Sequence, residues 1–142
     1  MKKIKIYSAT KGKKEDTVLY KSLMVDYNDT EVHYEENNTK SLQSLYNEFL
    51  GDARRNNIDI AVFVHDDVHI NCRDLFDRLE DSAQRYTVFG LAGAASAKIK
   101  TPALWHLMSE REDHRGCVAH GSPEQYYYTS FGSIPSRCLL ID

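Results

Sequence analysis

The sequence is poor in the features that mark disulfide-bonded and membrane proteins. Its 142 residues contain three cysteines, and an odd number at wide spacings fits neither a disulfide framework nor a zinc site. We therefore expect a reduced, intracellular environment and a cytoplasmic protein. No apolar run approaches the length of a membrane span, and the charged first residues lead into a strand pattern instead of a signal-peptide core. We expect no membrane span.

An excess of positive charge is also absent. The formal net charge is −3 and the pI is about 6.1, so we expect no general binding of a nucleic-acid backbone. The amino-terminal part does hold a local group of lysines. A solvated face explains such a group more often than contact with phosphates does. The lysines are Lys2, Lys3, Lys5, Lys11, Lys13 and Lys14.

Two common catalytic motifs are missing as well. No GxSxG occurs, so there is no nucleophile elbow for a hydrolase. The pair Gly12-Lys13 is not part of GxxxxGK[ST], which excludes the phosphate-binding loop of P-loop enzymes. The first strand ends in Ser8 and not in acidic residues, which disfavours an aspartate phosphotransfer receiver.

Strand patterns alternate with helix patterns over the first 95 residues or so. This alternation predicts an α/β fold with an open, mostly parallel sheet and helices on both faces, formed by one domain over residues 1–142. Beyond the alternating part, strands are expected at 117–120 and 137–141, and a helix is expected from residue 101. The tyrosine run 126–128 supports no prediction. The alternating strands are expected at 3–8, 31–34, 60–64 and 86–92, and the helices at 15–24, 41–56 and 71–85.

The stretch 60–70, IAVFVHDDVHI, is the strongest candidate for a functional site. Its five apolar residues predict a strand buried on both faces of a parallel sheet. His65, Asp66 and Asp67 follow at once, at the carboxyl edge where open α/β sheets bind ligands. Neighbouring carboxylates repel unless a positive charge is close, and a divalent cation holding a phosphorylated ligand would supply it. A strand followed by an ordinary turn is the alternative.

Two other segments are candidates for ligand contacts. The polar loop 35–39 follows a predicted strand, where ligand contacts are common. It also precedes the clearest amphipathic helix, so one of Asn38, Thr39 and Ser41 is expected to be its N-cap. The small residues 93–97 would let a backbone approach a ligand or a neighbouring helix closely.

The order of these features resembles the glycosyltransferase-like proteins of the nucleotide-diphospho-sugar transferase fold. The shared features are the Asn-rich loop, a helix with Tyr46-Asn47, the element VFVHDDV, a further helix, and FGLAGAA followed by Trp105. The nearest pattern is that of small family-2-like members with a His-x-Asp form of the Asp-x-Asp motif. The resemblance implies a GT-A-like fold shortened at its carboxyl end, with a donor-binding half and an acceptor half that is largely absent.

The resemblance also implies roles for particular residues. Asp67 and His65 would hold Mn²⁺ or Mg²⁺, and Asp66 would contact the ribose or diphosphate. Gly93 and Ala94 would lie where the sugar is approached. The base and ribose would be held by Ser8, Ala9, Thr10, Glu36, Asn37 and Asn38.

The implied activity is transfer of a sugar from a UDP- or GDP-sugar to an acceptor that the sequence does not identify. The alternative is a non-catalytic nucleotide or nucleotide-sugar binding module that acts with a protein partner. A shortened sheet would expose an edge strand that could pair with a second copy, so a homodimer is plausible.

Overall fold

The computed structural model describes residues 2–70, 72–89, 117–122, 125–130 and 139–141. The chain divides into two compact units, Met1–Phe89 and Gly90–Asp142. Each unit is considered by itself. The single domain expected from the sequence stays a prediction.

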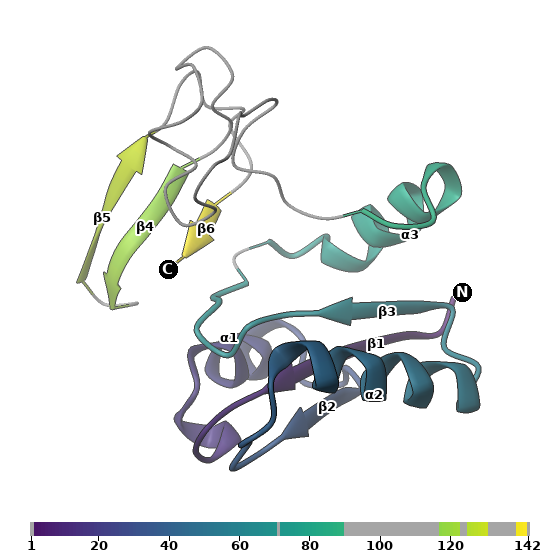
Figure 1. The fold of residues 1–142 in the computed structure, drawn as a ribbon. Helices are drawn as coiled ribbons and strands as arrows, with labels where there is room; N and C mark the ends of the chain where they lie inside the picture. Colours follow the sequence, from purple (N-terminus) through teal and green to yellow (C-terminus); the bar gives the residue numbers. More distant parts are fainter. Residues whose placement is uncertain (1, 71, 90–116, 123–124, 131–138, 142) are drawn as a thin grey trace, which may run out of the picture. The chain divides into compact units, whose positions relative to one another are not determined.

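The first unit contains a three-stranded parallel sheet with the strand order β2-β1-β3 (Figure 1). This arrangement confirms the α/β class and the open parallel sheet, whereas the GT-A fold stays a prediction. A short 3-10 turn, Lys14–Asp16, precedes the first α-helix. In chain order the elements are β1 (Ile4–Ala9), α1 (Val18–Asp26), β2 (Val32–Glu35), α2 (Leu42–Arg55), β3 (Ile60–Phe63) and α3 (Leu75–Arg85).

Helices cover both faces of this sheet, as the sequence predicts (Figure 1). Neighbouring residues of a strand point to opposite faces, and Ile6 and Tyr7 of β1 are both 0% exposed. Ile6 packs in a cluster with Leu19 and Leu23 of α1. Tyr7 packs in a second cluster with Leu45 of α2. Two separate apolar cores therefore hold the sheet between α1 and α2.

Helix α2 begins where the sequence predicts. Ser41 is its N-cap, and the Ser41 hydroxyl accepts a hydrogen bond of 3.3 Å from the Ser44 amide. The buried face of α2 is narrower than the apolar stripe of the sequence, because Leu42 and Leu50 at its margins are 47% and 40% exposed. A sheet of three short strands covers only the centre of the stripe, which is Leu45, Phe49 and Ala53.

Strand β3 is covered on both faces but only in part: Val62 packs against the α1 core, and Ala61 and Phe63 pack against the α2 core. Ile60 is buried, but the three residues that follow are only half-buried. The enclosed strand is β1, which has β2 on one side and β3 on the other. Strand β3 pairs with β1 alone among the described strands, so it is less enclosed than β1 although helices pack on both of its faces.

Two boundaries near the end of the first unit also differ from the sequence prediction. Helix α3 starts at Leu75 with Asp74 as N-cap, three residues after the expected N-cap, Asn71. The described part of the strand expected at 86–92, which is 86–89, is not a strand. Val88 in this part is 88% exposed, so its apolar side chains are not buried against the sheet.

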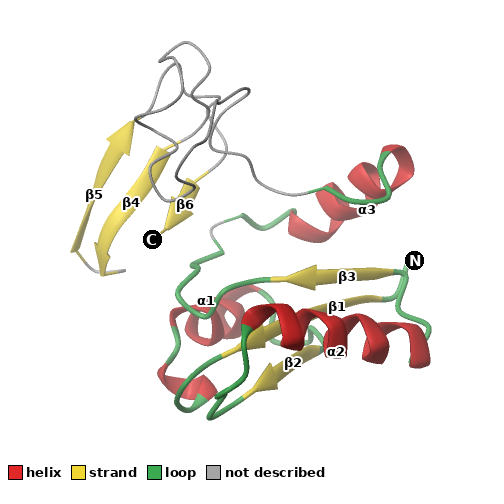
Figure 2. Ribbon diagram, in the orientation of Figure 1, coloured by secondary structure: helices red, strands yellow, loops and turns green. Residues whose placement is uncertain are grey.

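The second unit contains a smaller mixed sheet with the order β5-β4-β6 (Figure 2). Strand β4 (Cys117–Ser122) pairs antiparallel with β5 (Gln125–Ser130) and parallel with β6 (Leu139–Ile141). The strands expected at 117–120 and 137–141 are confirmed in their described parts. The tyrosine run 126–128, which supported no prediction, lies in β5.

Some sequence expectations fall on residues that are not described. These are the small-residue segment 93–97 and the helix from residue 101. Within the described part of the chain, no helix combines the length and the apolar character that crossing a bilayer requires.

Candidate functional site

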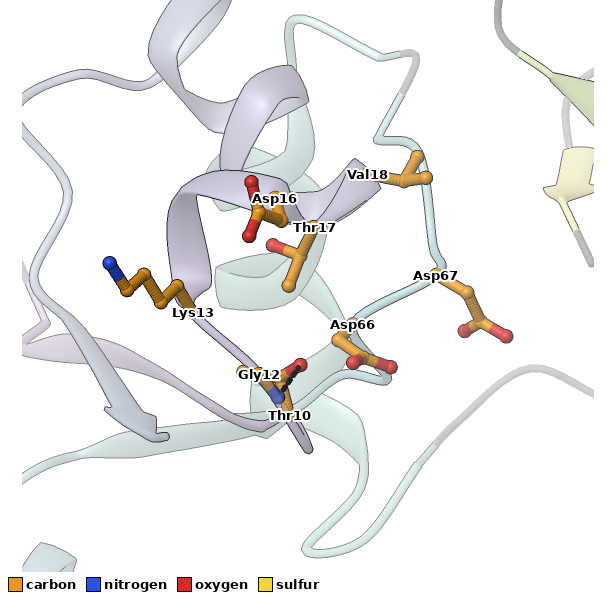
Figure 3. A pocket seen from close by; sticks show the side chains of 8 residues that line it. All are labelled: Thr10, Gly12, Lys13, Asp16, Thr17, Val18, Asp66 and Asp67. Atoms are coloured by element: carbon orange, nitrogen blue, oxygen red, sulfur yellow. Dashed lines mark hydrogen bonds between the residues drawn. The ribbon is translucent and has the colours of Figure 1, made fainter. Parts of the chain in front are cut away.

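A cavity of about 240 Å³ lies at the carboxyl edge of the three-stranded sheet (Figure 3). Its walls come from the loop after β1, the amino end of α1 and the turn after β3. In Figure 3 the Asp66 carboxylate lies towards Thr10, while the Lys13 and Asp67 side chains extend to opposite sides. The lining residues are Thr10, Gly12, Lys13, Asp16, Thr17, Val18, Asp66 and Asp67.

The strand order explains why a cavity forms at this place. The chain leaves β1 towards β2 on one side and later enters β3 on the other side (Figure 2). The loops that follow β1 and β3 therefore come together at the carboxyl edge, where the Leu19 amide at the start of α1 donates to the Asp66 carbonyl. Open α/β sheets bind their ligands in the crevice at such a topological switch point.

The first wall, the loop after β1, is held by the loop after β2. The Thr10 amide donates a hydrogen bond of 3.0 Å to the Glu35 carbonyl, which extends the pairing of β1 and β2 by one residue. The Asn38 amide donates to the Thr10 carbonyl at 2.8 Å, and the Asn37 amide donates to the Gly12 carbonyl at 3.1 Å. Backbone groups thus fix the two loops against each other.

Side chains of the second loop complete this connection. The Glu36 carboxylate accepts a hydrogen bond of 2.8 Å from the Lys14 amide. The Asn38 side chain bonds to both the amide and the carbonyl of Lys40, at 2.8 and 3.0 Å. Asn37 has a φ of 51°, a left-handed conformation that asparagine tolerates better than most residues. These three residues shape the wall, and none of them lines the cavity.

The second wall is the turn after β3. The Val64 amide donates to the Tyr7 carbonyl at 3.0 Å, so β3 stays paired with β1 up to the turn. The Asp66 carbonyl accepts a hydrogen bond of 3.0 Å from the Leu19 amide in the first turn of α1. Asp66 is half-buried and Asp67 is exposed. The backbone of the turn is therefore anchored while its carboxylates stay open to a ligand.

The third wall is the start of α1, which Thr17 caps. The Thr17 hydroxyl accepts a hydrogen bond of 3.1 Å from the Tyr20 amide and donates one of 2.7 Å to the Lys14 carbonyl. Thr17 is only 7% exposed. Its hydroxyl serves mainly to join the 3-10 turn to α1, and this joint fixes the position of the helix end beside the cavity.

Buried hydroxyl groups lie behind this wall. Ser8 and Tyr34 are paired neighbours in β1 and β2. Burial raises the pKa of the Tyr34 hydroxyl to about 12, and the negative charge of Asp66 contributes to this rise. Ser8 is 2% exposed, and its hydroxyl has no hydrogen-bond partner among the described residues. Ser8 therefore lies behind the cavity and not in its lining.

The donor atoms of the cavity suit a cation that is shared with a ligand. Among the described residues no group of three His, Cys, Asp or Glu side chains is placed to hold a metal ion by itself. Asp66 and Asp67 both line the cavity. Mg²⁺ is commonly bound through one or two carboxylates with phosphate oxygens completing its shell, and the two carboxylates fit this mode. His65 is exposed and does not line the cavity.

The structure thus brings together three of the residues named from the sequence, Thr10, Asp66 and Asp67. Ala9 packs against the α2 face, and Gly93 and Ala94 lie outside the described residues. The lining residues that sequence reasoning missed come from the segment 12–18. A Thr one residue before the apolar pattern of α1 was the available signal, because it marks the true N-cap.

Comparisons of this chain with protein-family models, with curated proteins and with solved structures gave no match. The glycosyltransferase resemblance therefore stays a prediction, and the functional argument depends on the cavity.

Proposed function

We propose that this chain binds a nucleoside diphosphate sugar in the cavity and transfers the sugar to an acceptor, with a divalent cation as cofactor. The observation that carries the proposal is the position of Asp66 and Asp67 at the switch point between β1 and β3. Two neighbouring acidic residues that line one cavity make it anionic, and a phosphorylated ligand binds well to it only through a cation.

Three lining residues would have different roles in binding the cation and the phosphates. Asp67, which is exposed, would hold the cation, and the half-buried Asp66 would share it or accept a ribose hydroxyl. When bound, Mn²⁺ or Mg²⁺ supplies Lewis-acid stabilisation of the negative charge on the departing diphosphate. The exposed Lys13 on another wall adds a positive charge near the phosphates.

Calorimetric titration tests the binding step. UDP and GDP are titrated into the protein with Mn²⁺ and, separately, with a chelator. The proposal predicts binding of one nucleotide that requires Mn²⁺ and is lost in Asp67→Asn. The matched control is Asp29→Asn, because Asp29 is an exposed carboxylate in the connection before β2, at the opposite edge of the sheet. Metal-independent binding, or equal loss in both variants, would contradict the proposed site.

Transfer is tested by turnover. A protein that binds a UDP- or GDP-sugar with Mn²⁺ and slowly hydrolyses it, with loss of both properties in Asp67→Asn, has the chemistry of a transferase. Binding without any release of nucleoside diphosphate, with or without candidate acceptors, would favour the binding module that acts with a protein partner.

A further inference from the structure

Helix α1 holds the acidic turn after β3 at two points that are three residues apart on the helix. The Leu19 amide donates to the Asp66 carbonyl at 3.0 Å. The Ser22 hydroxyl accepts a hydrogen bond of 3.2 Å from the Ile70 amide. Residues three apart share one face of a helix, so one face of α1 fixes both ends of the segment that carries Asp66 and Asp67.

The Ser22 hydroxyl is well suited to this task. Ser22 is 2% exposed, and Ile70 is 9% exposed. The same hydroxyl donates a hydrogen bond of 2.9 Å to the Leu19 carbonyl, which fixes the direction of its lone pairs. Because both residues are shielded from solvent, water cannot replace the Ser22 hydroxyl as the hydrogen-bond acceptor of the Ile70 amide.

The rest of the segment depends on these anchors. The Val68 amide donates to the His65 carbonyl at 3.3 Å, a contact within the turn itself. Val68 packs partly buried against the core that contains Ile6 and Leu19. The side chains of Asp66 and Asp67 stand between the Leu19 and Ser22 anchors and make none of these contacts. Their position relative to the cavity follows from how firmly the backbone is held.

We infer that Ser22 is a positioning residue for the cation site, which sets the affinity of Asp66 and Asp67 for a divalent ion without contacting it. This inference rests on the proposed function, because it concerns the same carboxylates. Residues that orient metal ligands typically change metal affinity by about 10- to 100-fold when they are replaced. A single hydrogen bond behind the ligands places Ser22 near the lower end of that range.

The experiment compares Ser22→Ala, which removes the hydroxyl, with Ser22→Thr, which keeps it. Binding of Mn²⁺ in the presence of UDP is followed by the electron paramagnetic resonance signal of free Mn²⁺, at a temperature where circular dichroism shows every variant folded. The expected result is about 10-fold weaker Mn²⁺ binding for Ser22→Ala and nearly unchanged binding for Ser22→Thr. Hydrogen exchange of the Ile70 amide should become faster only in Ser22→Ala.

Tyr27→Phe is the control for general destabilisation. Tyr27 lies in the same core cluster at the end of α1, and its hydroxyl bonds to the Cys72 carbonyl and the Leu75 amide, which follow the segment 66–70. Tyr27→Phe should keep the wild-type affinity for Mn²⁺. Wild-type affinity in Ser22→Ala, or an equal loss in Tyr27→Phe, would overturn the positioning role alone. No Mn²⁺ binding by the wild-type protein with any nucleotide would overturn the proposed function and this inference with it.

Discussion

The polar network around Asp52 allows a quantitative test of how α2 is attached to the sheet. One Asp52 carboxylate oxygen accepts hydrogen bonds from the Tyr7 hydroxyl at 2.9 Å and from the Lys5 ammonium at 3.1 Å. Lys5 also pairs with Glu31 at 3.1 Å. The Lys5 and Asp52 side chains are 11% and 24% exposed, and Tyr7 is 0% exposed. The network joins β1 to α2.

The contacts of this network give the expected loss in the free energy of unfolding for each substitution. Tyr7→Phe removes one hydrogen bond to a charged group, which contributes about 1.5–3 kcal/mol, and we expect about 1.5 kcal/mol because Asp52 keeps Lys5. Removing one partner of a buried ion pair costs about 3–5 kcal/mol. For Asp52→Ala we expect about 2–3 kcal/mol, at or below the lower limit, because the Asp52 side chain is 24% exposed and Lys5 keeps Glu31. The double variant should lose little more than Asp52→Ala, since the Tyr7 hydroxyl then has no carboxylate to bind.

Urea unfolding followed by far-UV circular dichroism measures the four free energies, by linear extrapolation to water. The double-mutant cycle should give a coupling energy of about 1 kcal/mol or more between Tyr7 and Asp52. The control is Asp29→Ala, which removes an exposed carboxylate and should change the free energy of unfolding by less than about 0.5 kcal/mol. Full additivity of the Tyr7 and Asp52 substitutions would refute the reasoning.

Two further predictions concern pH and the start of α3. The hydrogen bonds from Tyr7 and Lys5 lower the pKa of Asp52 in the folded protein. The ionised Asp52 therefore stabilises the fold above the unfolded pKa of about 3.9, and this stabilisation is lost as the pH falls through the folded pKa. The free energy of unfolding should fall less steeply with decreasing pH in Asp52→Ala. The Tyr27 hydroxyl donates to the Cys72 carbonyl and accepts from the Leu75 amide at 3.2 Å, so Tyr27→Phe should lower the free energy of unfolding by about 1–2 kcal/mol and speed hydrogen exchange at Leu75. An unchanged urea midpoint in Tyr27→Phe would show that α3 needs no such cap.

The sequence predicts the elements of the first unit well where the local signal is strong. Helix α2 has both an amphipathic period and the N-cap Ser41, and both appear in the structure. Helix α3 has a similar period but starts late, because Asp74 makes no side-chain cap and the Tyr27 hydroxyl from another helix bonds to the Leu75 amide instead. A cap from a distant residue leaves no mark in the local sequence.

The candidate site is predictable in its location and less so in its composition. The acidic pair after β3 gives the location, because the carboxyl edge of a parallel sheet is where ligands bind. The roles of Glu36 and Asn38 were not predictable, since polar loop residues are equally suited to a ligand and to the backbone of a neighbouring loop. The role of Ser22 could not be predicted, because the sequence does not show which group a serine hydroxyl inside a helix will bind.

Paramagnetic broadening of amide signals by Mn²⁺ tests the central claim most directly. Mn²⁺ is added in small amounts to ¹⁵N-labelled protein that is saturated with UDP or GDP, and the amides that lose intensity are identified. The account predicts that broadening concentrates on residues 10–18 and 64–68, the three walls of the cavity, and disappears in Asp67→Asn. Broadening centred on any other part of the chain, or its persistence in Asp67→Asn, would contradict the proposed cation and nucleotide site.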